Sequence, residues 1–425
     1  MADLCFVIQS HSSHLCYAFH SHLCPAVTCW RQQPSAAGPY RKCLIKHNGQ
    51  DDSAAILDAF EKCKDGGRVV FSKGKNYVLG DVIVTPELNN VEIIFEGNLK
   101  YPFNMKYNDT TPPIENGVQG VSSFFIIKGK NIKVTGKGGE IHGSGEECWY
   151  LDPLPSNRPV MMAFYAENLD VRGMRLINSP NWNFYVLESK NVNFEDIYIH
   201  DVDLVHGEKP HNTDGWDFSN VQDIRVTSSY INNADDCVSI KTNCTNIRIE
   251  NLYCNGSHGI SVGSLGKDLT KPDYVENIYV KNVTCDNCQN GARVKTWSNH
   301  PQGYVKNISY IDFTVTNSDH PITIDQCYFN TPEDECLANP SEIKISAATF
   351  KNVKGSASKK AGDVVADIIC SALTPCQDFH FENIDIKPYN LGHKPIYECE
   401  NLANNATAGI QCTPIFYPLP QSNVS

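Results

Sequence analysis

Acidic and imidazole side chains recur at nearly even intervals in the middle of the chain. Asp235 follows Asp214 by 21 residues, and His258 follows Asp236 by 22 residues. This interval is close to one turn of a solenoid, in which each coil stacks a strand about 4.8 Å from the previous one. Carboxylates that are distant in sequence would then become neighbours on one face of the stack.

Clustered carboxylates have the chemistry that cleavage of a glycosidic bond requires. One carboxylic acid protonates the leaving oxygen while a second carboxylate assists the nucleophile. Crowding of Asp214, Asp235 and Asp236 would raise the pKa of at least one of them, because like charges disfavour joint ionisation. A histidine one coil further on, His258, could hydrogen-bond the acid. Asn-Asp and Asp-Asp pairs are also ordinary turn residues, but three such clusters at coil spacing favour a site.

A basic pair follows this cluster. Arg293 and Lys295 are two residues apart on an expected strand, so their side chains point to the same face. The planar guanidinium suits a carboxylate, and the lysine adds a point charge. An exposed edge that carries two cations is the alternative. The position of the pair, one long coil after His258, favours a role on the same wall.

Together these motifs resemble glycoside hydrolase family 28, the polygalacturonases and their relatives. The motifs that carry the resemblance are Asn212-Thr213-Asp214, Asp235-Asp236, Gly256-Ser257-His258-Gly259 and Arg293-Val294-Lys295. Segments 179–183, 254–266 and 324–328 resemble the fungal exo-acting branch. The resemblance covers about residues 39 to 415, and four motifs in the correct order make it specific.

The resemblance implies a role for each acidic motif residue. Asp235 corresponds to the general acid that protonates the glycosidic oxygen. Asp214 and Asp236 correspond to the pair that holds and activates the attacking water, and His258 to the histidine that supports protonation of the acid. The family works by single displacement with inversion, although coil spacing alone would suggest the shorter carboxyl separation of retaining enzymes.

The remaining motif residues are implied to bind substrate. Asn212 orients the site, Arg293 and Lys295 grip galacturonate carboxylates, and Tyr328 lies near the bond that is cut. No metal and no other cofactor is implied. The implied ligand is a pectic polysaccharide, polygalacturonate.

The activity implied is that of an exo-polygalacturonase acting on the non-reducing end. Long loops, such as Pro102–Gly117 and Val202–His211, could close the cleft at one end. Alternatives are an endo-polygalacturonase, a xylogalacturonan hydrolase or an exo-rhamnogalacturonan hydrolase. From other classes, an inactive β-helix that binds carbohydrate and a calcium-dependent pectate lyase remain open. Trp182, Trp216 and Trp297 could stack on sugar rings or simply pack.

The elements that would position these residues come from a repeated phrase, a polar residue followed by alternating apolar positions. It begins at Asn90, Asn131, Asn168, Asn191, Asn220, Asn246, Asn277 and Asn307, with degenerate copies at Glu342 and Asp378. Alternation turns every second side chain inward, and the asparagines could stack as a hydrogen-bonded ladder. We therefore predict an all-β fold, a single-stranded right-handed parallel β-helix of about ten coils. Leucine-rich repeats and β-propellers have other periods and signatures.

A short helix is expected to cover the open N-terminal end of the stack. Asp52-Ser53 followed by Ala54–Cys63 is typical of a capped amphipathic helix. Its apolar face would comprise Ile56, Ala59, Phe60 and Cys63.

The chain has 18 cysteines, a count typical of an oxidised, secreted protein. Spacing suggests pairs Cys43–Cys63, Cys237–Cys254, Cys327–Cys336, Cys370–Cys376 and Cys399–Cys412, and a structural role for Cys285 and Cys288, although connectivity does not follow from sequence. Seven glycosylation sequons begin at Asn108, Asn243, Asn255, Asn282, Asn307, Asn405 and Asn423. Both features predict an extracellular glycoprotein.

Charge narrows the possible partners. The chain of 425 residues has a formal net charge of −12 and a pI near 5.6, which argues against nucleic acid. A polyanionic substrate would need a local basic cluster, which Arg293, Lys295, Lys241 and Lys267 could form. No apolar run approaches the roughly 20 residues of a membrane span. A monomer is expected.

Three segments are expected along the chain. Residues 1–38 fit a degenerate signal or a wrongly assigned start of the gene, because Asp3 and several histidines interrupt the pattern of a signal peptide. Their cysteines and histidines match no zinc-ligand spacing. Residues 39–415 are the expected catalytic β-helix, and 416–425 a C-terminal tail.

Overall fold

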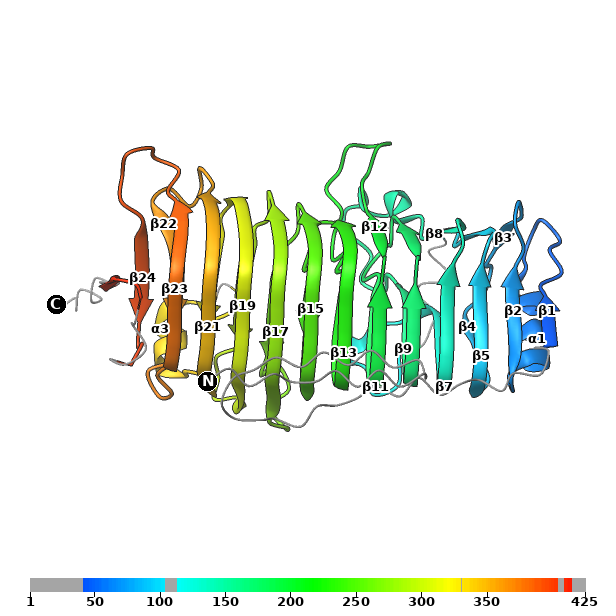
Figure 1. Ribbon diagram of the computed structural model, residues 1–425, viewed down its shortest axis with the longest axis horizontal. Helices are drawn as coiled ribbons and strands as arrows, with labels where there is room; N and C mark the ends of the chain where they lie inside the picture. The colour runs from blue at the N-terminus through cyan, green and yellow to red at the C-terminus, as the bar shows by residue number, and fades with distance from the viewer. Residues whose placement is uncertain (1–40, 104–112, 330, 404–408, 415–425) are drawn as a thin grey trace, which may run out of the picture. The chain divides into compact units, whose positions relative to one another are not determined.

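A computed structural model describes residues 41–103, 113–329, 331–403 and 409–414. Within these ranges, all paired strands of the sheet run parallel. Successive coils of the chain stack these strands on one another (Figure 1). The helices are short: α1 (Ser53–Cys63), α3 (Glu333–Ala338), and the 3-10 helices η1 (Val118–Gly120) and η2 (Gly145–Glu147). The predicted parallel β-helix is confirmed.

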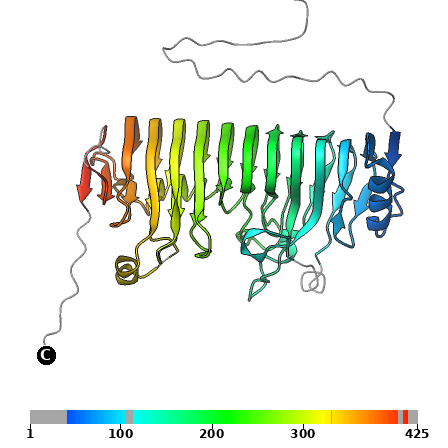
Figure 2. The same cartoon turned by 90° about the horizontal axis from the view of Figure 1, so that it is seen from below.

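The longest face of the coil is a single stack of twelve strands, counted over the described residues. In order, it consists of β1 (Arg41–Leu44), β2 (Gly67–Phe71), β5 (Leu88–Phe95), β7 (Ser123–Gly136), β9 (Val160–Arg172), β11 (Phe184–Glu195), β13 (Trp216–Asn232), β15 (Cys244–Asn255), β17 (Asp273–Asp286), β19 (Gln302–Ser318), β21 (Glu342–Ala357) and β23 (Gln377–Lys387). Figure 2 shows these strands side by side along the stack.

Two further faces complete each coil. The face that will carry the site continues from the first residues of β13 through β14 (Val238–Ile240), β16 (Ile260–Leu265), β18 (Asn290–Thr296), β20 (His320–Asp325), β22 (Val364–Ile369), β24 (Ile396–Glu400) and β25 (Cys412–Pro414). Earlier coils contribute β4 (Ile83–Val84) to it. A third face contains β3 (Asn76–Val78), β6 (Asn98–Lys100), β8 (Glu140–His142), β10 (Arg175–Ile177) and β12 (Tyr198–His200).

The ten repeated phrases fall on ten successive strands, β5 to β23, and β1 and β2 add two layers in front of them. Two phrases begin later than the sequence indicates. Asp223, and not Asn220, occupies the position equivalent to Asn191, because Val192 pairs with Ile224. Ala347, and not Glu342, is equivalent to Asn307, because Ile308 pairs with Ala348. The ten strands agree with the predicted count of about ten coils, and β1 and β2 extend the stack at its N-terminal end.

The expected asparagine ladder is confirmed. The asparagines that open the phrases have φ near +55° to +60°, the left-handed region that Asn tolerates better than other non-glycine residues. Each amide can then donate to the side chain one coil away, as Asn191 does to Asn168 (2.6 Å), Asn246 to Asp223 (2.8 Å) and Asn277 to Asn246 (3.0 Å). The ladder keeps successive coils in register.

Apolar rows fill the inside of the coil. On the face of the site the inward row runs Val186, Phe218, Ile240, Val262, Val294, Ile324 and Ile368, all buried. Burial of each such side chain contributes about 1.5–3 kcal/mol. Residues on either side of this row in sequence must point outward, which is how the fold presents polar side chains on a rigid wall.

The N-terminal helix forms as predicted. Ile56, Ala59, Phe60 and Cys63 are its buried apolar residues, and they join the core of the stack. The predicted cap at Asp52 is wrong in detail. The Asp52 carboxylate accepts hydrogen bonds from the amides of residues 48 and 78 and makes no side-chain cap.

Six disulfides are present in the described residues. All five predicted pairings are confirmed, and Cys285 bonds to Cys288. Within the described ranges, Cys148 and Cys244 are free and buried.

Among the described helices, none combines the length and apolar character that a membrane crossing needs. The segments expected to be a leader (1–38) and a tail (416–425) lie outside the described residues, as does most of the loop Pro102–Gly117.

Candidate active site

Three consecutive turns carry the acidic and imidazole residues. Each turn places one of these residues two positions before a strand: Asp214 before β13, Asp236 before β14 and His258 before β16. The first residues of the three strands pair in register. The backbone locks these turns together, since the amide of His258 donates to the carbonyl of Asp235 (2.7 Å) and that of Gly215 to the carbonyl of Asp236 (2.9 Å). Residues one coil apart therefore meet at one corner.

Gly259 explains why the turn at His258 takes this form. Its φ is +87°, and a Cβ atom there would lie 2.2 Å from the carbonyl oxygen of Gly291 on the next coil. Only glycine allows this approach, which brings the imidazole of His258 over the previous coil.

Asp235 is the most exposed carboxylate of the cluster and has three neighbours. Its Oδ1 lies 3.1 Å from Nδ1 of His258 and accepts the backbone amide of Asp236 (2.8 Å). Its Oδ2 accepts a hydrogen bond from Nδ2 of Asn212 (3.3 Å). The side chain is 18% exposed, so part of this carboxyl group reaches solvent.

Asp236 is buried and paired with cations. Its Oδ2 accepts a hydrogen bond from Nζ of Lys295 (2.7 Å), and its Oδ1 accepts one from Ser261 Oγ (2.7 Å). A guanidinium nitrogen of Arg293 lies 4.0 Å from Oδ1. The negative charge of Asp236 is thus compensated from within the protein.

Asp214 is buried without such compensation. Its Oδ1 makes no hydrogen bond to any described residue. Burial, together with the charges of Asp217, Asp235 and Asp236, raises the pKa of Asp214 well above its ordinary range. The Asp214 carboxyl therefore holds a proton more readily than an ordinary aspartate does, and its buried Oδ1 lacks a partner that a bound water would supply.

The pKa of Asp235 is shifted in the opposite direction. Burial alone would raise this pKa, but the hydrogen bond from His258, the charge of His258 and the charge of Lys295 outweigh burial and lower it. In the free site, the Asp235 carboxyl is ionised at neutral pH.

Arg293 and Lys295 project from the same side of β18, with buried Val294 between them. Lys295 is almost fully buried and engaged with Asp236, so its ammonium is less available to a substrate carboxylate than the sequence suggested. Arg293 keeps an unused donor, because its buried Nε has no hydrogen-bond partner among the described residues. The Tyr328 ring lies 5.3 Å from both cationic groups.

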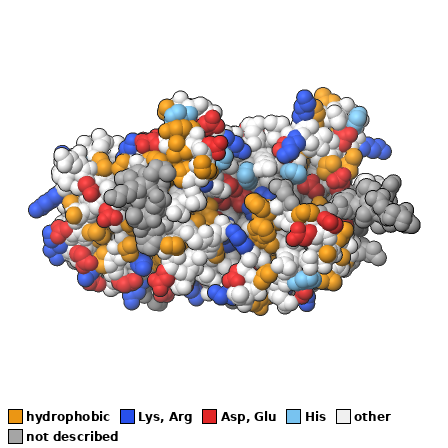
Figure 3. Space-filling view, turned by 180° about the vertical axis from the view of Figure 1, so that it is seen from behind, with side chains coloured by type: hydrophobic (Ala, Val, Ile, Leu, Met, Phe, Trp, Pro, Cys, Tyr) orange, Lys and Arg blue, Asp and Glu red, His pale blue; other side chains and the backbone are white. Residues whose placement is uncertain are grey.

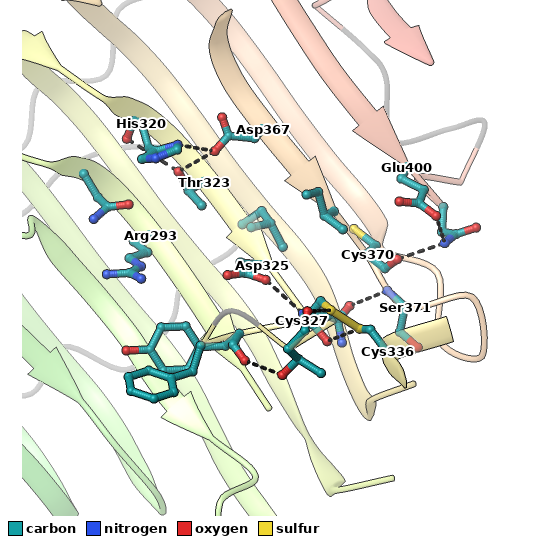
Figure 4. Close-up of a pocket in the computed structure, with 18 of the residues that line it drawn as sticks. Arg293, His320, Thr323, Asp325, Cys327, Cys336, Asp367, Cys370, Ser371 and Glu400 are labelled. Carbon is teal, nitrogen blue, oxygen red and sulfur yellow. Dashed lines mark hydrogen bonds and ion pairs between the residues drawn. A yellow bond between two sulfur atoms is a disulfide. The ribbon is translucent and has the colours of Figure 1, made fainter. Parts of the chain in front are cut away.

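A pocket of about 620 Å³ extends from His258, Arg293 and Tyr328 along β20 and β22. In Figure 4, Arg293 lies toward one side of the lining residues, Asp325 lies in the middle and Glu400 lies toward the other side. On the face seen in Figure 3, the surface is hollowed, and acidic, cationic and histidine side chains gather in the hollow. His258 and Arg293 thus belong both to the acidic cluster and to the lining of this pocket.

The donor atoms of Asp235, Asp236 and His258 lie within 4.8 Å of one another, a spacing that could hold a metal ion. However, Lys295 donates to Asp236, and His258 Nδ1 faces Asp235. A divalent cation would have to displace both contacts, so this donor set does not fit a metal well.

Two residues near the site are more deeply buried than the sequence indicates. Lys241, expected in a substrate-facing basic cluster, is buried and lies 2.9 Å from the Asp217 carboxylate. Burial raises the pKa of Asp217 to about 7, against the opposing charge of Lys241. Trp216 is fully buried and stacks on Phe184 in the core, so it packs and does not face sugar.

Arg158 was not singled out, because it lies 54 residues before Asn212 outside any motif. Its Nη2 donates a 2.7 Å hydrogen bond to Oδ1 of Asn212. Ser261 could have been found, since it occupies the position of Arg293 one coil earlier.

The sequence is similar to a known protein family and to curated members of it. Residues 63–408 match the model of the family described as glycosyl hydrolases family 28. The chain is 36% identical over 384 residues to the probable exopolygalacturonase B of Emericella nidulans, covering 86% of this chain and 85% of that protein. It is 36% identical over 390 residues to an exopolygalacturonase of Cochliobolus carbonum, covering 88% and 86%.

Solved structures show the same architecture. The endo-xylogalacturonan hydrolase of Aspergillus tubingensis matches with a TM-score of 0.77 and 29% identity, over 88% of this chain and 99% of that one. The exopolygalacturonase of Thermotoga maritima matches with a TM-score of 0.61 and 19% identity, over 82% and 92%.

Proposed function

The chain belongs to the glycosyl hydrolases of family 28, and we propose that this glycoside hydrolase is an exo-polygalacturonase. It would hydrolyse terminal α-1,4-galacturonosyl linkages of pectic homogalacturonan from the non-reducing end. The observation that carries the proposal is the meeting of Asp214, Asp235 and Asp236 with His258 and Arg293, the two residues of this cluster that also line the adjoining pocket.

Asp235 is the proposed general acid. It is the most exposed of the three carboxyl groups and the one that contacts an imidazole, so it can both reach the glycosidic oxygen and exchange a proton with His258. Its lowered pKa in the free site must rise before it can act. Lys295 is one cause of the low value, and a galacturonate carboxylate bound beside Arg293 and Lys295 would offset that positive charge. Substrate binding would then favour protonated Asp235.

Asp214 and Asp236 are the proposed pair that holds the attacking water. The buried Oδ1 of Asp214 lacks a hydrogen-bond partner that a water held in the site would supply, and Asp236 is a carboxylate already paired with an ammonium. The water oxygen bonds to the anomeric carbon as the bond to the leaving oxygen breaks. The proton of Asp235 goes to the leaving oxygen, and a water proton goes to the aspartate pair, with inversion at the carbon.

Exo action would follow from closure of the cleft beside the site. The loop Val202–His211 precedes the turn of Asp214, and Leu204 at its tip is 86% exposed. The ring of His206 lies 4.0 Å from that of Tyr150, which ties this loop to the segment before β9. In Figure 1 the chain between β12 and β13 projects from the stack. A sugar chain would then be able to leave the site in one direction.

The product profile on homogalacturonan of defined length tests the proposal. We expect galacturonic acid as the product from the earliest time points, whereas a ladder of oligomers would indicate endo-cleavage. A second candidate substrate is xylogalacturonan, which the likeness to the Aspergillus tubingensis structure favours. Faster release from xylogalacturonan than from homogalacturonan would select that alternative.

We also propose that the protein acts outside the cell on plant-wall pectin. Six disulfides among the described residues support an oxidising compartment, because cytosolic thiols are kept reduced. Recovery of activity and antigen in the culture medium of a producing cell would test this location.

A further inference from the structure

Arg158 is a buried cation held by neutral oxygens. Its side chain donates four hydrogen bonds: Nε to the carbonyl of Pro155 (3.0 Å), Nη1 to the carbonyls of Pro180 and His211 (2.7 Å each), and Nη2 to Oδ1 of Asn212 (2.7 Å). No carboxylate of the described chain forms an ion pair with it within 4.0 Å. Burial of an unpaired charge is costly, which points to a purpose other than stability.

The hydrogen bond to Asn212 determines how its amide is oriented. A guanidinium can only donate, so it must face the carbonyl oxygen Oδ1 of the amide. The NH₂ group is then directed to the other side, where Nδ2 lies 3.3 Å from Oδ2 of Asp235. The reversed amide would set donor against donor at Arg158 and acceptor against carboxylate at Asp235. Arg158 thus fixes which end of Asn212 meets the acid.

The same guanidinium also holds the backbone around Asn212. The residue has φ of +55°, a left-handed conformation that needs support from its surroundings. Arg158 supplies that support by binding the carbonyl of His211, and its bond to Pro180 joins this turn to the chain before β11. Both the main chain and the side chain of Asn212 are therefore held by one residue.

We propose that Arg158 is a positioning residue for proton transfer, which acts through Asn212 to hold Oδ2 of Asp235 toward the leaving oxygen. This inference rests on the proposed acid role of Asp235. His258 and the Asp236 amide hold Oδ1 of the same carboxyl. Among the described residues, Asn212 donates the hydrogen bond to Oδ2, the oxygen that remains for the substrate. Loss of Arg158 impairs protonation of the leaving group more than it impairs substrate binding at Arg293.

The test compares Arg158→Lys with wild type on two substrates, a galacturonate oligomer and an aryl galacturonide with a nitrophenol leaving group. We expect kcat on the oligomer to fall by about 10- to 100-fold, as for other misplaced catalytic groups, with KM little changed. The loss should be much smaller on the aryl substrate, because nitrophenolate departs without a proton. Arg175→Lys, at an arginine that pairs with Glu140 away from the site, is the matched control and should change neither rate.

Asn212→Asp separates positioning from folding. An aspartate can still accept from Arg158 but cannot donate to Asp235, so we expect the same defect, dependent on the leaving group, in a protein that melts like wild type. In an Asn212→Ala background, Arg158→Lys should cost little more. Equal losses of Arg158→Lys on both substrates, additive effects in the double variant, or full activity of Asn212→Asp would overturn the proposal.

A crystal structure of Arg158→Lys gives a readout that does not need activity. We expect the Asn212 side chain to turn away from Asp235. An unchanged contact between Nδ2 and Oδ2 would overturn the inference whatever the substrate, whereas a wild-type protein inactive on both galacturonides would contradict the proposed function instead.

Discussion

Nδ1 of His258 lies 3.1 Å from Oδ1 of Asp235, although 22 residues of chain separate the two side chains. This contact is one of the causes that lower the pKa of Asp235, and it joins the proposed acid to an imidazole on the next coil. The predictions that follow depend on this pair and on the two carboxyl groups beside it.

Asp235→Asn should abolish hydrolysis while leaving substrate binding in place. The amide has the shape of the carboxyl but cannot supply an acidic proton, and general acid catalysis is worth about 10²–10⁴-fold. Reducing-sugar release should fall by that factor, while calorimetry with a galacturonate oligomer should still detect binding. Undiminished turnover in this variant would refute the acid assignment.

Asp214→Asn and Asp236→Asn should both be inactive but should change stability in opposite directions. A carboxyl whose pKa is raised on folding destabilises the folded state as the pH rises from its unfolded pKa, about 4, through the folded pKa. Since the pKa of Asp214 is raised by burial, Asp214→Asn should increase the melting temperature at pH 7, and this gain should vanish below about pH 4.

Asp236→Asn is the matched comparison for that measurement. It leaves the buried ammonium of Lys295 without its carboxylate, and removal of one partner of a buried pair costs about 3–5 kcal/mol. Its melting temperature at pH 7 should therefore fall. A decrease of equal size for Asp214→Asn would contradict the uncompensated burial of Asp214.

Removal of divalent cations should leave activity unchanged. Lys295 and His258 already occupy the positions at Asp236 and Asp235 that a metal ion would need. Assays after dialysis against EDTA should match untreated enzyme, and the products should show no absorbance of unsaturated sugars. Recovery of lost activity by calcium, together with such absorbance, would indicate a lyase.

Shortening of the loop Val202–His211 between Leu204 and Lys209 should raise the share of oligomeric products. The loop precedes the turn that carries Asp214 and contacts Tyr150 through His206. If the proposed site is correct, loss of the loop would open the cleft to chains on both sides of the bond. Chromatography of early products measures the change. Trimming of the exposed loop at Leu391, between β23 and β24, is the control and should leave the product profile as it was.

Much of the architecture follows from local rules that the sequence displays. Alternating apolar residues after each asparagine set the strands, and the asparagine positions set the coils, because the left-handed turn and the amide ladder both favour that residue. The slip from Asp223 to Asn220 shows the limit of this pattern. An aspartate can occupy the same turn and accept from Asn246, so the residue type alone does not identify the coil.

The sequence also indicated the members of the site, because residues at coil spacing must lie near one another in a stack. Spacing could not show how they share charge. Side-chain directions and burial decide how the charges are paired. Lys295 is engaged with Asp236 and Lys241 is buried against Asp217, whereas Asp214 forms no ion pair within the described residues.

By itself, therefore, the sequence determined the repeat, the disulfide-rich character and the set of chemical groups, since periodicity and residue type are written along the chain. Only the tertiary structure decided which carboxyl group has its charge balanced by a cation and which one is exposed. It also decided that Arg158 holds Asn212. Those contacts join segments with no common spacing, and hydrogen bonds of about 3 Å are set by packing in three dimensions.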